Sequence, residues 1–490
     1  MNKEVKLIGQ QNKHFEKLCQ SYDKNKFIVD LSDLGTGKTV ITMAIAQKYK
    51  KKLIVICPLA LNSSWLDHGS KYDVKIDQIL TYDVLAGTKH GIHHKYLDFN
   101  YKLDRKGNLS KDRFLPSKYL LDLIDKDATM FVFDECVSLM NPTLAFEAAL
   151  CIINACRDKI CVSLISGHPI DKDDRCINML RLMGIMNGNE VCNRRGPTGI
   201  LDVVNYSRNM DRDKSEEIID KYGYNKASIA RYTAYMLLSN VILPKYSSRM
   251  NMPQNPNVYN LHVGVPKETY KSILEATDML EEASYYDRIT NTVSDRLNET
   301  LGAITKSMQL IEIRKTPVFI KLAESFLKAK QKLKIVIFVI YKESMKLLKE
   351  GLKEYDPLVL NGDTDKDERG ELISKFQSRD LKYRVIIVGL QTASLGINLN
   401  DTTGLIPRVT LISPTTFRFK ELSQCSARTY RMNTIGKAFV YFVYAYLKGS
   451  ENLNYEMRIL NNLQHKSNVS RMILQSETNK YPGEYEVKKI

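Results

Sequence analysis

The 490-residue sequence lacks the features that mark membrane and secreted proteins. Its longest apolar runs, such as residues 335–341 and 438–447, fall well short of the roughly 20 residues that a membrane-spanning helix needs. The amino terminus, Met-Asn-Lys-Glu-Val-Lys, has no apolar stretch of the kind found in a secretory signal. We therefore expect a soluble, intracellular protein with no membrane partner, and the sequence leaves cytoplasm and nucleus open.

Cysteines are scattered and unpaired along the sequence. There are nine, with no Cys-x-x-Cys pair, and Cys57, Cys136 and Cys161 lie within or beside apolar, strand-like runs. This pattern favours reduced core residues over disulfides or zinc ligands.

Acidic residues are outnumbered by basic ones, 56 against 72, which gives a net charge of +16. A surplus of this size favours a polyanionic partner such as nucleic acid, although lysine-rich surfaces also keep proteins soluble. The apolar share of 43% is ordinary for a folded globular protein, and the length allows two or three domains.

Short runs rich in Val, Ile and Phe recur in two parts of the chain, and turn residues and helix-like segments follow several of them. They lie at residues 26–31, 52–57, 129–133 and 160–165, and again at 335–340, 358–360, 385–388, 409–412 and 439–446. Such runs are typical of buried strands in mostly parallel sheets. Between them, polar helix-like segments such as residues 267–283 and 295–313 take over.

The sequence thus predicts an α/β protein with two lobes and a largely helical middle. We place the boundaries at residues 1–180 for the first lobe, 181–332 for the middle region or linker, 333–450 for the second lobe and 451–490 for a C-terminal tail.

Residues 86–118 form a basic, aromatic insertion in the first lobe. They contain eight Lys or Arg against three Asp, with interleaved Tyr96, Phe99, Tyr101 and Phe114. Two interpretations stand equal: a segment that follows a phosphate backbone and stacks on bases, or a solvated surface hairpin. We expect the histidines of this stretch to be an exposed cluster rather than a metal site; they are His90, His93 and His94.

The strongest chemical signal is the loop at residues 32–39, Ser-Asp-Leu-Gly-Thr-Gly-Lys-Thr, which precedes a helix-like segment at 40–49. Its two glycines let backbone N–H groups turn toward a polyphosphate, and the positive end of the helix favours the same anion. Lys38 can reach the β- and γ-phosphates, and the hydroxyl of Thr39 can hold Mg²⁺. We expect ATP contacts from Gly35, Thr36, Gly37, Lys38 and Thr39.

A strand-like run that ends in Asp134 and Glu135 supplies the second half of an ATPase centre. At the carboxyl end of a parallel strand, Asp134 would bind Mg²⁺ through water beside the phosphate loop. Glu135 would then orient and deprotonate the attacking water.

With these motifs in order, the chain resembles the Swi/Snf-like ATPases of helicase superfamily two over about residues 10–447. The segments similar to family motifs are 32–39, 56–65 (ICPLALNSSW), 80–85 (LTYDVL), 134–142 (DECVSLMNP), 166–170 (SGHPI), 335–338, 360–363, 391–399 (QTASLGINL) and 424–432 (QCSARTYRM). Departures from the family pattern include Val137, His168 and Ser394, and none removes a group essential to hydrolysis.

This resemblance implies two RecA-like lobes and further site residues. Gln11, or Gln10 in its place, would read the adenine edge. Nucleic-acid contacts would come from Pro58, Trp65, Thr81, Gly396 and Asn398, although packing at a helix start is an equal interpretation for Trp65. The residues that couple ATP and nucleic acid would be Ser166, Gly167 and Pro169.

The last motif contains Gln424, Arg428 and Arg431 in the pattern Gln-x-x-x-Arg-x-x-Arg. If the segment is helical, its two arginines lie one turn apart and project from one face. An arginine finger stabilises the charge of the phosphoryl-transfer transition state and raises the rate by about 10³–10⁵-fold. We expect the second lobe to supply both arginines when the lobes close on ATP.

We therefore expect an ATP-dependent nucleic-acid motor, in the first place a translocase on duplex DNA that hydrolyses ATP to ADP and phosphate. The alternatives are a strand-separating helicase on DNA or RNA, and a nucleic-acid-binding regulator switched by ATP. The compact chain suggests a viral, plasmid or microbial protein that works beside transcription or replication proteins.

Overall fold

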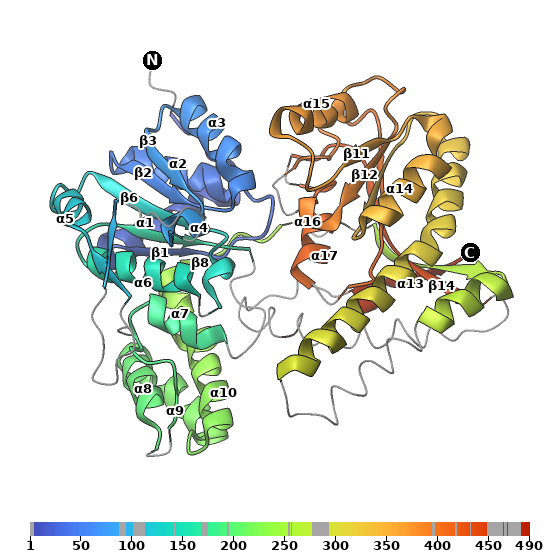
Figure 1. Ribbon diagram of the computed structural model, residues 1–490. Coiled ribbons are helices and arrows are strands. Elements are labelled where there is room, and N and C mark those ends of the chain that lie inside the picture. Colours follow the sequence, from blue (N-terminus) through green and yellow to red (C-terminus); the bar gives the residue numbers. More distant parts are fainter. Residues whose placement is uncertain are drawn as a thin grey trace. The chain divides into compact units, whose positions relative to one another are not determined.

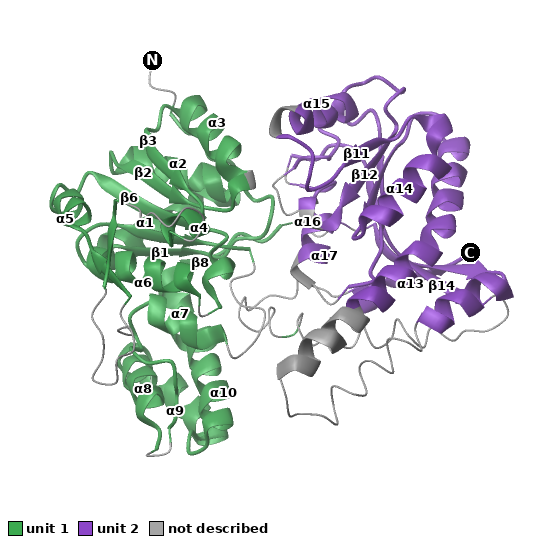
Figure 2. Ribbon diagram, viewed as in Figure 1, with its two compact units in different colours: residues 1–252, 468–478 green, residues 253–467, 479–490 purple. Residues whose placement is uncertain are grey.

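The computed structural model describes residues 4–87, 95–100, 113–141, 143–167, 175–193, 196–252, 255, 257–276, 294–393, 397–416, 419–431, 433–447, 464, 468 and 482–490. The chain divides into two compact units, residues 1–252 with 468–478 and residues 253–467 with 479–490 (Figure 2). Each unit contains one parallel sheet with helices packed against it (Figure 1). This confirms the predicted α/β class with mostly parallel sheets in two lobes.

The sheet of the first unit has six strands in the order β3-β2-β6-β7-β1-β8, and every pair is parallel. The strands are β1 (Phe27–Asp30), β2 (Lys52–Ile56), β3 (Ile76–Leu80), β6 (Thr129–Asp134), β7 (Val162–Ile165) and β8 (Ser247–Ser248). The associated helices are α1 (Gln10–Asn25), α2 (Lys38–Lys48), α3 (Asn62–Tyr72), α4 (Tyr82–Leu85), α5 (Lys118–Asp125), α6 (Leu144–Cys156) and α7 (Cys176–Leu182).

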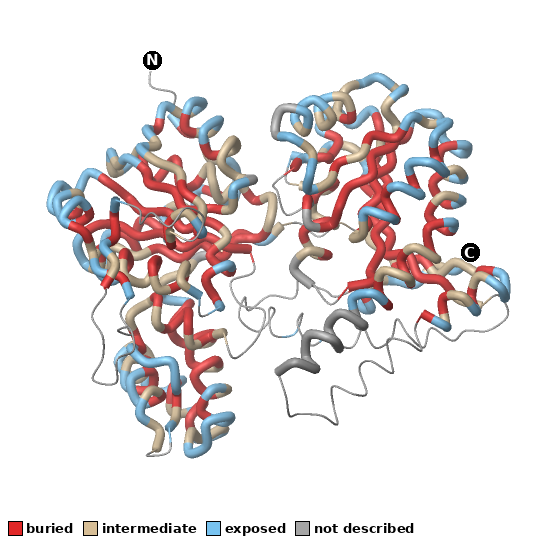
Figure 3. The backbone as a smooth tube through the Cα atoms, in the orientation of Figure 1, coloured by how far each residue is buried: buried red, intermediate tan, exposed pale blue. Residues whose placement is uncertain are grey.

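Both faces of this sheet are buried, as Figure 3 shows by colour. Successive residues of β6 alternate between two apolar clusters: Phe131 and Phe133 belong to one, and Met130 and Val132 to the other. A strand covered on both sides is apolar at every position, which explains why these runs could be recognised from the sequence.

The residues expected to form a separate helical middle region are instead divided between the two units. Helices α8 (Thr198–Met210), α9 (Arg212–Tyr222), α10 (Ala227–Leu237) and α11 (Leu243–Tyr246) belong to the first unit and share its main apolar cluster. A single π-helical stretch, Leu238–Ile242, joins α10 to α11. Strand β9 (Val258–Val265) lies in the sheet of the second unit, where we had expected no strand.

The second sheet has seven strands in the order β11-β12-β10-β13-β14-β9-β15, all parallel. Besides β9, they are β10 (Lys334–Val339), β11 (Leu358–Leu360), β12 (Val385–Gly389), β13 (Arg408–Ile412), β14 (Ala438–Leu447) and β15 (Glu486–Lys489). Strand β15 lies in the segment that we had expected to be a tail after the last strand. The helices are α13 (Ser294–Ala329), α14 (Lys342–Gly351), α15 (Lys366–Gln377), α16 (Leu390–Ala393) and α17 (Phe419–Ser426).

Part of the basic insertion folds as a small antiparallel hairpin, β4 (Leu97–Phe99) with β5 (Phe114–Pro116). Tyr96 and Phe114 are buried in the first unit, and the ring of Phe99 packs edge-on against that of Phe114 with 5.9 Å between centroids. These three aromatic rings therefore serve the core, which favours the hairpin over a base-stacking surface. Tyr101 and the three histidines lie outside the described residues.

All nine cysteines are free, and Cys57, Cys136 and Cys161 are fully buried, as predicted. Among the described residues, no helix is both long and apolar enough to span a membrane.

Glu312 of α13 is a buried carboxylate, 1% exposed, that ties this helix to the end of β10. It accepts hydrogen bonds from the backbone N–H groups of Ile340 (3.0 Å) and Tyr341 (3.0 Å), just before α14 begins. Burial raises the pKa of Glu312, while these N–H groups act in the opposite direction.

Replacing Glu312 with Ala should lower the free energy of unfolding by about 2–3 kcal/mol, because buried N–H groups would lose their acceptor. Urea denaturation followed by circular dichroism measures the change. Glu312→Gln, which keeps a carbonyl acceptor, is the matched control and should lose less. Equal losses in both variants would show that these hydrogen bonds are not the cause.

Candidate active site

The loop after β1 has the backbone of a phosphate cradle. Gly35 and Gly37 have φ angles of 83° and 92°, in the left-handed region that favours glycine. The loop is closed by its own groups: Lys38 Nζ donates to the carbonyl of Ser32 (2.9 Å), and Thr36 Oγ1 donates to that of Asp33 (2.7 Å). Helix α2 begins at Lys38, so its free N–H groups and positive end lie at the loop.

Gln11, and not Gln10, contacts this loop. The buried Gln11 side chain donates from Nε2 to the carbonyl of Thr36 (2.9 Å) and accepts from the N–H of Ile8 (3.0 Å). A Cβ atom at Gly37 would lie 2.7 Å from Gln11 Nε2, so only glycine fits there. Gln10 is exposed and donates to the carbonyl of Asn251 (3.1 Å).

Asp134, the last residue of β6, has a buried carboxylate with two hydrogen bonds. Oδ2 accepts from the indole Nε1 of Trp65 (2.9 Å), and Oδ1 accepts from the backbone N–H of Glu135 (2.9 Å). Burial and the charge of Glu135 raise the pKa of Asp134 to about 6, while Lys38 and the two hydrogen bonds lower it. Asp30 at the end of β1 and Asp134 at the end of β6 are both in register with Ile165 of β7, so the loop and the acid pair follow strands on either side of β7.

Glu135 has a left-handed backbone conformation, with φ 53° and ψ 45°. This region costs a non-glycine residue roughly 1–2 kcal/mol, so surrounding contacts must hold it. One of these contacts is the Tyr82 hydroxyl, which donates to the carbonyl of Asp134 (2.7 Å). Burial raises the pKa of Tyr82 well above its ordinary value, so the hydroxyl keeps its proton near neutral pH.

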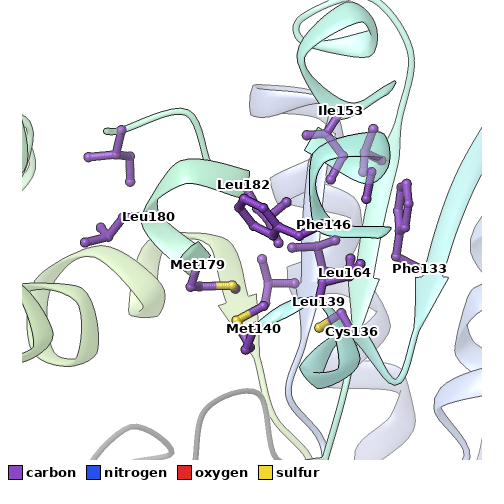
Figure 4. Close-up of a cluster of buried hydrophobic side chains, with 14 of the residues drawn as sticks. Phe133, Cys136, Leu139, Met140, Phe146, Ile153, Leu164, Met179, Leu180 and Leu182 are labelled. Atoms are coloured by element: carbon purple, nitrogen blue, oxygen red, sulfur yellow. The ribbon is translucent and has the colours of Figure 1, made fainter. Parts of the chain in front are cut away.

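The short 3₁₀ helix η2 (Cys136–Leu139) anchors the chain directly after Glu135 in the core of the first unit. Figure 4 shows the cluster that surrounds it; its labelled residues are Phe133, Cys136, Leu139, Met140, Phe146, Ile153, Leu164, Met179, Leu180 and Leu182. Both sides of the acid pair are therefore fixed, by β6 before it and by η2 after it.

A second polar network lies on the other side of the loop, and the sequence analysis missed it. Asp30 Oδ2 lies 3.2 Å from His14 Nε2, and Asp30 Oδ1 accepts from the N–H of Ser32 (2.9 Å). Burial tends to raise the pKa of Asp30, but the hydrogen bond and charge of His14 lower it below its ordinary value. No local motif marks His14 or Asp30, because only the packing of α1 against β1 brings them together.

The segment from Arg249 to Met252 is bonded to the start of the loop. Ser32 Oγ accepts from the N–H of Met250 (3.0 Å), and the carbonyl of Met250 accepts from the N–H of Asp33 (2.9 Å). The Asp33 carboxylate pairs with the Arg249 guanidinium and accepts from the N–H of Met252 (2.8 Å). Asp33 thus holds the loop against the last residues of the first unit.

Two of the three predicted coupling residues lie at this site. Ser166 follows β7 and is buried, and its N–H donates to the carbonyl of Asp30 (3.1 Å). A Cβ atom at Gly167 would lie 3.6 Å from Lys38 Nζ. Pro169 falls outside the described residues.

Pro58 and Thr81, predicted to contact nucleic acid, line one pocket of about 540 Å³. Its other lining residues are Leu59, Tyr82, Asp83, Ala86, Ser138, Thr143, Leu144 and Ala145. Trp65 lies elsewhere: it is 1% exposed and its indole bonds to Asp134, which contradicts the nucleic-acid role and supports packing at the start of α3. Asn398 is exposed in the second unit, and Gly396 falls outside the described residues.

The expectation that Arg428 and Arg431 project from one helix face is wrong. Helix α17 ends at Ser426, and both arginines lie in the irregular segment that follows. The Arg428 carbonyl accepts from the N–H of Leu399 (3.0 Å), and Arg431 Nη2 donates to the carbonyl of Ile397 (3.0 Å). The segment thus packs against residues 397–399 of an adjacent motif.

The predicted residues of the last motif are close together and largely desolvated. Gln424 is 1% exposed and Arg428 is 5% exposed. Burial and the charge of Arg428 lower the pKa of Arg431, yet a guanidinium remains protonated near neutral pH. Arg431 is half-buried, whereas Arg428 is buried.

The donor set near the loop suits Mg²⁺ bound together with a nucleotide. Hydroxyl and carboxylate oxygens, here Thr39 and Asp134, are hard ligands that magnesium prefers beside phosphate oxygens. Among the described residues no cluster of three or more His, Cys, Asp or Glu could hold a metal by itself. The residues therefore fit a metal that arrives with its nucleotide rather than one in an all-protein site.

Parts of the chain are similar to known proteins. Residues 318–433 match the family model of the helicase conserved C-terminal domain. The chain is 25% identical over 420 residues to "Putative ATP-dependent RNA helicase L364" of Acanthamoeba polyphaga mimivirus, covering 84% of this chain and 74% of that protein.

Two solved structures of the Sulfolobus solfataricus SWI2/SNF2 ATPase core are also similar. The core in complex with dsDNA is 16% identical, with 96% of this chain and 97% of that chain covered and a TM-score of 0.32. The core domain is 18% identical, with 91% and 86% covered and a TM-score of 0.32.

A phosphate loop, an acid pair and a helicase C-terminal domain together define an NTP-hydrolysing enzyme of the helicase type. The chain is thus similar to ATP-dependent helicases, and its motifs resemble those of the Swi/Snf-like ATPases of helicase superfamily two.

Replacing Gln11 with Ala should weaken ATP binding by about tenfold, because the loop loses a buried hydrogen bond and its support beside Gly37. Titration with a fluorescent ATP analogue measures the dissociation constant. Gln10→Ala removes an exposed amide one residue away and should leave the constant unchanged. A larger effect from Gln10 would reverse the assignment.

Proposed function

We propose that this protein is an ATP-driven translocase on double-stranded DNA that moves along the duplex without separating its strands. The observation that carries the proposal is the full set of Swi/Snf-like motifs, whose phosphate loop and acid pair lie at the carboxyl edge of one parallel sheet. A net charge of +16 supports a polyanionic track.

In this proposal the first unit binds ATP with Mg²⁺. Gly35, Thr36, Gly37 and Lys38 bind the phosphates, and Gln11 contacts the adenine. Thr39 and Asp134 hold the metal, which when bound neutralises charge on the transferred phosphate. Glu135 orients the attacking water and accepts its proton, and the products are ADP and phosphate.

Arg428 and Arg431 would stabilise charge on the γ-phosphate in the transition state, with Gln424 beside them. Support comes from the burial of Gln424 and Arg428 and from the closeness of the two guanidinium charges. If the two arginines reach the γ-phosphate only when the lobes close on ATP, each hydrolysis event is coupled to a movement of one lobe. Ser166, Gly167 and Pro169 would transmit that movement.

The pocket that contains Pro58 and Thr81 would receive the DNA backbone, with Asn398 and Gly396 contacting it from the second lobe. Polar groups that bind phosphates fix position without reading sequence, which suits a motor that must move along any duplex. Thr81 and Thr143 cap α4 and α6 at this pocket, so helix amino ends face it.

Duplex DNA should stimulate ATP turnover more than single-stranded DNA or RNA does, because the proposed contacts follow a paired backbone. A steady-state phosphate-release assay with equal nucleotide concentrations of each polymer measures this. Equal or greater stimulation by RNA would contradict the proposal. Glu135→Gln is the control: turnover should fall by about 10²–10⁴-fold while ATP and DNA still bind.

A strand-separating helicase is the second candidate, favoured by the name of the mimivirus relative, which refers to RNA helicase activity. The two candidates differ in what happens to the strands. We expect no displaced strand from a forked DNA or RNA duplex at substoichiometric enzyme with ATP. ATP-dependent release of the labelled strand would favour the helicase instead.

A further inference from the structure

The peptide group between Asp134 and Glu135 is held at both of its polar atoms. Its carbonyl oxygen accepts from the Tyr82 hydroxyl (2.7 Å), and its N–H donates to Asp134 Oδ1 (2.9 Å). The other carboxylate oxygen of Asp134 accepts from the Trp65 indole (2.9 Å). Two side chains from outside β6 therefore orient both members of the acid pair.

This peptide group determines where the Glu135 carboxylate points. Rotation of a peptide plane changes the φ of the residue that follows it, and Glu135 has the unfavourable value of 53°. The hydrogen bonds at the carbonyl and at the N–H of this peptide group oppose its rotation and so hold Glu135 in this conformation. A small shift of Tyr82 would therefore move the group that activates water, without any change in the phosphate loop.

Tyr82 also belongs to the wall of the pocket proposed to bind DNA. It is the first residue of α4, directly after Thr81, and both residues line that pocket with Pro58. Ser138 of η2, three residues after Glu135, lines the same pocket. The pocket is thus lined both by Tyr82, whose hydroxyl is bonded to Asp134, and by η2, which follows Glu135 in the chain.

Trp65 provides a second connection between the wall of the pocket and the acid pair. It lies in the first turn of α3, which follows Pro58 and the short 3₁₀ helix η1 (Leu59–Leu61). Its ring is buried in the apolar cluster on one sheet face, so the indole moves only with this segment. A charge-assisted hydrogen bond of this kind is roughly twice as strong as a neutral one.

We propose that Tyr82 and Trp65 are positioning residues through which DNA in the pocket aligns the Asp134–Glu135 pair and so stimulates ATP hydrolysis. This inference rests on the proposed function, since it takes the DNA backbone to be the occupant of the pocket. Neither residue touches ATP; each acts through the acid pair.

The test is Tyr82→Phe, which removes one hydroxyl and keeps the ring. With saturating duplex DNA, kcat should fall by about threefold to tenfold, the equivalent of one hydrogen bond. Unstimulated turnover should fall by a smaller factor, because the same hydroxyl holds Glu135 without DNA, so the ratio of stimulated to unstimulated kcat falls. Trp65→Phe should act in the same direction.

Tyr96→Phe is the matched control. Tyr96 is also a buried tyrosine of the first unit, its hydroxyl donates to Gln78 Oε1 (2.8 Å), and neither residue lines the pocket. It should keep the wild-type ratio. A merely structural role of Tyr82 would lower stimulated and unstimulated kcat together and leave the ratio unchanged, which would overturn the inference.

A spectroscopic readout is available because Trp65 is the sole tryptophan. At 1% exposure it cannot stack on DNA, so a change in its emission on adding duplex without nucleotide reports movement beside Asp134. We expect a change in the wild type and a smaller one in Tyr82→Phe, with DNA binding followed separately by anisotropy of a labelled duplex. Unchanged emission at saturation would overturn the inference.

The two proposals fail in different ways. If duplex DNA does not stimulate the wild-type enzyme, the proposed function is wrong. If it stimulates the wild type and Tyr82→Phe equally, the proposed function stands and the positioning role is wrong.

Discussion

The active site depends on a buried carboxylate at the end of a central strand. Asp134 is 7% exposed, and an ionised carboxylate in such a place is costly unless hydrogen bonds and a cation compensate for lost water. Trp65, the Glu135 N–H and Lys38 supply that compensation in the protein itself. These three groups come from different segments, so stabilising this one carboxylate requires the loops around it to take fixed positions.

Parallel topology explains why so many segments reach this point. In a sheet built from right-handed crossovers, all carboxyl ends lie at one edge, and ligands bind there. The loops after β1, β2, β3, β6 and β7 carry the phosphate loop, Trp65, Tyr82, the acid pair and Ser166 in turn. The nucleotide site and the pocket are thus neighbouring parts of one edge, and a shared residue such as Tyr82 follows from that geometry.

In the second unit, buried Lys and Arg side chains are stabilised by hydrogen bonds to backbone carbonyl groups. Lys315 Nζ donates to the carbonyl of Val443 (2.8 Å), and Lys334 Nζ donates to that of Phe376 (2.8 Å). Arg408 donates to the carbonyl of Ile406 (2.7 Å) beside the motif that contains Asn398. Arg408 Nε also donates to the carbonyl of Leu399 (3.2 Å), and the N–H of Leu399 donates to the carbonyl of Arg428, so Arg408 supports the segment of the last motif.

The sequence by itself determined the features that local pattern encodes. Strands covered on both faces, such as β6 and β10, are apolar at their interior positions, and a phosphate loop needs glycine at the two positions with positive φ. The order of the motifs then indicated the resemblance to Swi/Snf-like ATPases. The acid pair was recognisable because its two carboxylates follow a continuous apolar run.

Only the tertiary structure decided the features that depend on distant partners. Strand β9 contains Asn260, which is buried and whose Nδ2 donates to the carbonyl of Tyr485, so its sequence does not resemble a core strand. The position of Trp65 could not be predicted locally either, because its hydrogen-bond partner lies 69 residues away. In the segment after α17, packing on residues 397–399 replaces the expected helix. A local pattern specifies what a segment can form; long-range contacts choose where its side chains point.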